Sequence, residues 1–119
     1  MSQFDRLDSV RQQLREFVAE RDWEQFHDPK NLAMTIASEA GELVAEYRWV
    51  RSEHADGMTL EPEAGCRVAA EAADVGIAWL LFCDRVGIDP LEVVEEKIRQ
   101  NRDRYPVHLS KGRSERPQT

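Results

Sequence analysis

Residues 62–86 read PEAGCRVAAEAADVGIAWLLFCDRV, a stretch in which apolar side chains dominate. Pro62 suits the first position of a helix, and Gly87, directly after the stretch, suits the end of one. Two acidic residues, Glu71 and Asp74, interrupt the apolar side chains three positions apart. The stretch therefore predicts a long helix that carries two carboxylates in apolar surroundings.

Three further helices are predicted from their apolar spacing, and two of these also have start signals. Asp28-Pro29 and Asp89-Pro90 are helix starts, because Asp can cap the free amides of the first turn and Pro suits the first helical position. Glu92 is placed to complete a capping box at the second of these starts. The four predicted helices cover residues 5–21, 28–51, 62–86 and 89–104.

The segments between these helices are short. Residues 22–27 are expected to form an ordered loop rich in aromatic side chains, and residues 52–60 a polar connection. Because no strand-like alternation and no internal repeat is present, the predicted fold class is all-α, a four-helix bundle. The domain is expected to cover residues 1–109. Residues 110–119 contain no apolar side chain and are expected to form a mobile tail.

Size and charge exclude several classes of protein. A chain of 119 residues has room for one core. Its formal net charge of −7 argues against general binding of nucleic acids, which needs an electropositive face. The longest apolar stretch, residues 75–83, is too short to span a bilayer, so no membrane association is expected. Residues 1–5 have neither the basic segment nor the apolar core of a signal peptide, and a cytoplasmic location is expected by default.

The two cysteines are not expected to form a disulfide with each other. Cys66 and Cys83 fall in one predicted helix, 17 positions apart, which is roughly 25 Å at the helical rise. That separation is several times the reach of a disulfide. Both are interpreted as packing residues of a protein from a reducing compartment.

Acidic residues occur where the helix pattern would place apolar side chains. Glu39 lies on the apolar stripe of the second predicted helix and Glu42 follows three residues later, the spacing that Glu71 and Asp74 repeat. Residues three apart project together, so each pair points two carboxylates at one spot. Clustered carboxylates repel, and a divalent cation removes that cost. Since Mg²⁺ prefers oxygen ligands, the pattern predicts a magnesium site, with ordinary solvated helix acids as the alternative.

The same acids, with their flanking sequence, resemble a known enzyme family. Glu39-x-x-Glu42, an interval of 28 residues (positions 43–70) and Glu71-x-x-Asp74 resemble the metal-binding motif of MazG-like nucleotide pyrophosphohydrolases. The resemblance covers roughly residues 5–112 and is greatest to the dCTP pyrophosphatase branch. Three blocks carry that second resemblance: ERDWEQFH at 20–27, PKNL at 29–32 and NRDRYPVHLSKG at 101–112.

The resemblance implies a function and an assembly. The expected reaction is magnesium-dependent hydrolysis of a (deoxy)nucleoside triphosphate, dCTP or a modified dCTP, to the monophosphate and pyrophosphate. Glu39, Glu42, Glu71 and Asp74 would bind Mg²⁺, and Glu39 or Glu42 would also position or deprotonate the attacking water. The family forms homodimers or homotetramers, and the apolar surface of four amphipathic helices also favours self-association.

Further residues match substrate contacts of the family. Lys97 and Asn101 match a Lys-x-x-x-Asn motif that lies against the triphosphate, and four positions apart they share a helix face. Trp23 and Trp49 match aromatic residues of the base pocket, with a place in the core as the alternative for each. His27 is expected either to contact substrate or to hold its loop in place.

Two positions depart from the dCTP branch. Leu14 stands where that branch has a histidine, and Ala78 stands where it has an aromatic residue. Both positions would lie near the nucleoside, and the smaller Ala78 would leave room for a larger or modified base. The choice of base is therefore open.

Three other interpretations remain open. A di-metal oxidase of the ferritin type needs two Glu-x-x-His motifs, and only Glu24-x-x-His27 is present, in a predicted loop. A non-catalytic dimerisation or regulatory module could keep the bundle without turnover, although the set of four acids speaks against it. A phosphoribosyl-ATP pyrophosphohydrolase would have a similar length and fold, but the aromatic block at 23–27 favours the dCTP branch.

Overall fold

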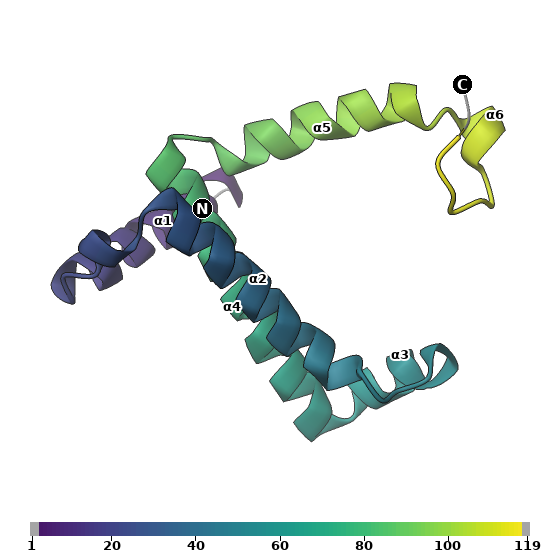
Figure 1. Cartoon of the computed structure of the whole chain (residues 1–119), viewed down its shortest axis with the longest axis horizontal. Helices are drawn as coiled ribbons and strands as arrows, with labels where there is room; N and C mark the ends of the chain where they lie inside the picture. The colour runs from purple at the N-terminus through teal and green to yellow at the C-terminus, as the bar shows by residue number, and fades with distance from the viewer. Residues whose placement is uncertain (1–2, 118–119) are drawn as a thin grey trace. The chain divides into compact units, whose positions relative to one another are not determined.

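The computed structural model describes residues 3–117, with side chains from residue 6 onward, and this part of the chain is helical without any strand. The predicted all-α fold class is confirmed, with six α-helices in place of four. The elements are α1 (Gln3–Glu20), the short 3-10 helix η1 (Glu24–Phe26), α2 (Pro29–Tyr47), α3 (Ser52–Leu60), α4 (Pro62–Val86), α5 (Pro90–Arg104) and α6 (Val107–Ser110) (Figure 1).

The chain divides into two compact units at the boundary between Gly87 and Ile88. In the first unit α2 and α4 run antiparallel and pack side by side along much of their length (Figure 1). Helices α1 and α3 also contact α4, which makes α4 the central helix of this unit. The second unit holds α5 and α6.

Side-chain caps and one glycine explain where three helices begin or end. The amide of Asn31 donates to Asp28 Oδ1 at 2.8 Å, and the amide of Glu92 donates to Asp89 Oδ1 at 2.9 Å. Each bond satisfies an amide that has no partner inside its helix. Gly87 closes α4 with a φ of 73°, a left-handed conformation that glycine adopts without steric cost. These predicted boundaries are confirmed.

Two connections differ from the prediction. Residues 52–60 form α3 in place of a polar connection, and residues 22–27 contain η1. Helix α2 ends at Tyr47, four residues before the predicted end, and the Tyr47 hydroxyl lies 2.6 Å from Thr59 Oγ1 on α3. Helix α3 has no buried residue and no side-chain cap at its start. Its contact with α4 and this bond to Tyr47 stabilise it, and neither follows from local sequence.

Few apolar side chains are fully buried within the described part of the chain. In the first unit they are Val18, Leu32, Ala64, Ala78 and Cys83, each 5% exposed or less, and Pro90 is buried in the second unit. Neither cysteine forms a disulfide, as predicted, but the packing role holds only for Cys83, because Cys66 is exposed. None of the described helices combines the length and the apolar character that a membrane span requires. The predicted start of the tail at residue 110 falls inside α6, and the mobility of that tail stays a prediction.

Candidate metal centre

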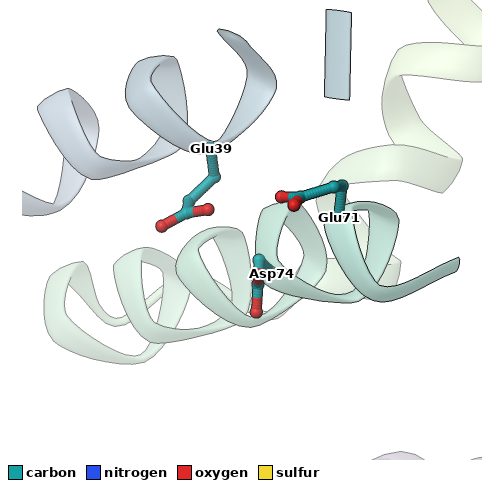
Figure 2. Close-up of side chains that lie close together, drawn as sticks. All are labelled: Glu39, Glu71 and Asp74. Carbon is teal, nitrogen blue, oxygen red and sulfur yellow. The ribbon is translucent and has the colours of Figure 1, made fainter. Parts of the chain in front are cut away.

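Three carboxylates from two neighbouring helices meet in the first unit. Helix α2 contributes Glu39, and α4 contributes Glu71 and Asp74 (Figure 2). One carboxylate oxygen of each residue lies within 4.8 Å of those of the other two. Glu39 and Glu71 are half-buried, whereas Asp74 is exposed. Oxygen atoms converging in this way can bind one divalent cation, and they are the ligand type that Mg²⁺ prefers.

The surroundings of Glu71 disfavour the charged form of its side chain. Desolvation raises the pKa of Glu71 above its usual value, and the neighbouring charges of Asp74, Glu42, Glu39 and Glu46 raise it further. Like charges held close together favour the protonated form of one of them. A bound cation would reverse that preference, so the crowding of carboxylates fits a metal site.

The two remaining acids of α2 lie in different environments. Glu42, the predicted fourth ligand, is exposed and lies outside the group of three, although its charge raises the pKa of Glu71. Glu46 is paired, because Arg67 Nε on α4 donates to Glu46 Oε2 at 3.2 Å. The role of Glu42 as a ligand or as a base stays a prediction.

Trp23 lies at the junction between α1 and η1. Its amide donates to the carbonyl of Val18 at 3.0 Å, and its ring meets Phe17 edge to face with centroids 5.6 Å apart. Asp22, just before it, has a φ of 54° and lets the chain turn sharply after α1. The Trp23 ring is therefore tied to α1 on one side and exposed on the other.

Trp49 follows α2 in a turn, and its side chain is 89% exposed. The alternative that Trp49 is a core aromatic is therefore wrong for this chain. A large ring in solvent can stack on a flat ligand or pack against another protein surface.

His27 and Ala78 are two further positions that the sequence analysis linked to the nucleoside. The amide of His27 donates to the carbonyl of Glu24 at 3.1 Å and closes η1, while its side chain lines a cavity of about 270 Å³. Both expected roles of His27 thus stay open. Ala78 is only 2% exposed, so its small side chain packs in the interior. The expectation that Ala78 leaves open space for a larger base is not supported in this chain.

Lys97 and Asn101 lie on α5 in the second unit, one turn apart on the same face. Lys97 is exposed and Asn101 is half-buried. At the end of α5 the carbonyl of Asn101 accepts a hydrogen bond from the amide of Tyr105 at 2.8 Å. This bond uses the backbone of Asn101 and not its side chain. Contact of these two residues with a triphosphate stays a prediction.

One polar pair within the first unit was not predicted from the sequence. Arg15 on α1 meets Asp84 in the last turn of α4 through three donor–acceptor distances between 2.5 and 3.2 Å. The two residues are 69 positions apart, so no local spacing links them. The only sign in the sequence is that Asp84 directly follows the apolar stretch of residues 75–83.

Comparison with known proteins gives close relatives of this chain, although no family model matches it. It is 38% identical to dCTP pyrophosphatase 1 of Rattus norvegicus over 106 residues, which is 89% of this chain and 62% of that protein. It is 35% identical to dCTP pyrophosphatase 1 of Homo sapiens over 108 residues, which is 91% of this chain and 64% of that protein. The chain therefore spans less than two thirds of the length of these curated relatives.

A solved structure matches over nearly its whole length. It is a pyrophosphatase from Archaeoglobus fulgidus DSM 4304, with a TM-score of 0.76 and 38% sequence identity. The match covers 89% of this chain and 94% of that one. Similarity of this extent in both sequence and structure indicates common descent.

Proposed function

Since this chain belongs to the MazG-like family of nucleotide pyrophosphohydrolases, we propose that it hydrolyses deoxynucleoside triphosphates to the monophosphate and pyrophosphate. The observation that carries this proposal is the convergence of Glu39, Glu71 and Asp74 on one spot between α2 and α4. The relatives named dCTP pyrophosphatase 1 support dCTP as the substrate. A modified dCTP is the alternative substrate.

Mg²⁺ is the cofactor that fits this donor set best. Three carboxylates offer oxygen ligands only. Desolvation, together with the charges of its acidic neighbours, raises the pKa of Glu71, and a bound cation would offset both effects. Glu39, Glu71 and Asp74, with Glu42 as the proposed fourth ligand, would hold the ion. When bound, Mg²⁺ would supply positive charge that neutralises phosphate oxygens of the substrate.

The proposed reaction is attack of water on the α-phosphorus. A new bond forms between that phosphorus and the water oxygen, and the bond to the bridging oxygen of pyrophosphate breaks. A carboxylate, Glu39 or Glu42, positions the water and accepts its proton. Trp23 and Trp49 are proposed to contact the base, while triphosphate binding by Lys97 and Asn101 stays a prediction from the family resemblance.

The product pattern tests this function. With dCTP and Mg²⁺ the protein is expected to release dCMP and pyrophosphate in equal amounts, as measured by phosphorus NMR, and chelation by EDTA is expected to stop the reaction. In water enriched in oxygen-18, mass spectrometry should find the heavy oxygen in dCMP, because the water attacks the α-phosphorus. Formation of dCDP and orthophosphate would contradict the proposal. A panel of substrates that includes phosphoribosyl-ATP tests the alternative that the protein is a phosphoribosyl-ATP pyrophosphohydrolase.

We also infer that the chain self-associates through the exposed side of the α2–α4 pair. A groove of about 480 Å³ on these helices is lined mainly by apolar side chains, among them Leu43, Val44 and Val68. Val44 is 62% exposed, and Leu60 on the adjoining α3 is 83% exposed. The buried core is small and many apolar side chains are exposed. Burial of this exposed apolar surface against a second copy of the chain therefore favours a homodimer or homotetramer.

Substitution in this groove is expected to break the assembly. Val44→Asp should shift the mass measured by light scattering toward that of a 13.7 kDa monomer, because a carboxylate buried without a partner opposes association. Val107→Asp is the matched control, since Val107 is equally apolar and exposed but lies on α6. A monomeric wild-type protein at micromolar concentration, or an unchanged mass of the Val44→Asp variant, would contradict the inference.

A further inference from the structure

An ion pair joins α1 to the last turn of α4 in the first unit. Arg15 Nε lies 3.0 Å from Oδ1 and 3.2 Å from Oδ2 of Asp84, and Arg15 Nη2 lies 2.5 Å from Oδ1. A planar guanidinium that meets one carboxylate through two nitrogens fixes the direction of the contact as well as its length. Arg11 adds a longer contact, 3.9 Å from its Nη2 to Asp84 Oδ1. The pair therefore links α1 to the end of α4 through a directional contact.

Stability alone is a weak explanation for this pair. The hydrogen bond from Arg15 lowers the pKa of Asp84, so the carboxylate is ionised at neutral pH and the pair is fully charged. The Arg15 and Asp84 side chains are nevertheless 48% and 32% exposed. Ion pairs that remain open to water contribute little to the free energy of unfolding. The main consequence of the contact is where it places α1.

Both helices continue into the proposed nucleotide site. Asp74 of the acid cluster precedes Asp84 by ten residues in the same helix, which is about 15 Å at the helical rise. On the other side, α1 carries Phe17 and Val18, which hold the ring and the amide of Trp23. The acid cluster and Trp23 are thus connected through two helices and the ion pair between them.

The pair also forms one wall of the cavity of about 270 Å³. Glu24 and His27, at the two ends of η1, line the same cavity, and Leu32 of α2 lines it as well. A shift of α1 would therefore move Arg15 and η1 together relative to α2 and α4. The shape of the cavity is therefore expected to depend on the ion pair.

We propose that Arg15 and Asp84 are a positioning pair that holds the Trp23 end of the nucleotide site at a fixed distance from the acid cluster on α4. The proposal rests on the proposed function, and neither residue touches the reacting atoms. Loss of the pair weakens binding of the nucleoside, while the carboxylates and the attacking water keep their places. The Michaelis constant then rises without a matching fall in kcat.

A double-mutant cycle with dCTP and Mg²⁺ tests this pair. Arg15→Ala and Asp84→Ala are each expected to raise KM about five-fold with kcat within two-fold of wild type, on the scale of a partly exposed ion pair. The double variant is expected to match either single variant, because all three lack the same contact. Arg99→Ala is the matched control: it removes an arginine–carboxylate pair with Glu96 that lies within α5, and KM should not change.

Asp84→Asn keeps the shape of the side chain and removes its charge, so it replaces Asp84→Ala if circular dichroism shows that variant to be unfolded. Three results would each overturn the positioning role. They are an unchanged KM in both single variants, additive effects on KM in the double variant, and a fall in kcat that parallels the rise in KM. A wild-type protein that turns over no nucleoside triphosphate would instead overturn the proposed function. The two failures are thus distinguished by the wild-type assay alone.

Discussion

Glu71→Gln and Asp74→Asn are each expected to lower turnover of dCTP by at least about a hundred-fold, the scale of losing one group that stabilises charge in a transition state. Each change removes an oxygen ligand from the group of three on α2 and α4. The fold should survive, because the folded protein disfavours a negative charge at Glu71. Desolvation and the acidic neighbours of Glu71 raise its pKa. As pH rises through that raised pKa, the negative charge that Glu71 gains disfavours folding, and glutamine carries no such charge.

The measurement is a rate of pyrophosphate release, together with thermal unfolding in the absence of metal. The melting temperature of Glu71→Gln without metal is expected to equal or exceed that of the wild type, and added Mg²⁺ should raise it less than it raises the wild type. Glu63→Gln is the matched control, since Glu63 is an exposed acid in the first turn of the same helix. A tenth of wild-type activity in either cluster variant would refute the acid site.

Local signals in the sequence were sufficient where a helix carries its own boundaries. Helix α4 begins at Pro62 and ends at Val86 as predicted, because proline and Gly87 act at the ends themselves. Helix α3 has neither kind of signal, since Arg51 at its start makes no side-chain cap and none of its residues is buried. Its formation depends on contact with α4, and tertiary contacts are not visible in local spacing.

The candidate site was likewise predictable where it depends on spacing within one helix, and not where it depends on packing between helices. Glu71 and Asp74 project together because they are three apart on one helix, and Glu39 joins them because it lies on the stripe of α2 that faces α4. The exposure of Glu42 depends on the rotation of α2 about its own axis, which packing sets. The pair of Arg15 with Asp84 depends on where α1 crosses α4. Such contacts follow only from the folded arrangement of the helices.

Trp49→Ala is expected to raise KM for dCTP, dTTP and dATP together by roughly ten- to a hundred-fold, which corresponds to the loss of one stacked base. The ring is 89% exposed, so its removal should leave the melting temperature unchanged and the effect on KM can be assigned to binding. Trp49→Phe is the matched control, because a smaller ring keeps a stacking face and should recover part of the affinity. Equal KM values for wild type and Trp49→Ala would exclude this residue from the base contact.

The same substrate panel reports how the base is selected. Stacking accepts every base, because each has a flat face, whereas sharp selection requires buried polar groups that the wrong base leaves unpaired. Leu14 and the buried Ala78 supply no such group at the two positions where the dCTP branch has a histidine and an aromatic residue. We therefore expect dCTP to be preferred over dTTP and dATP by less than about ten-thousand-fold. A larger ratio would mean that other polar side chains read the base, and equal rates would remove dCTP as the proposed substrate while leaving pyrophosphohydrolysis in place.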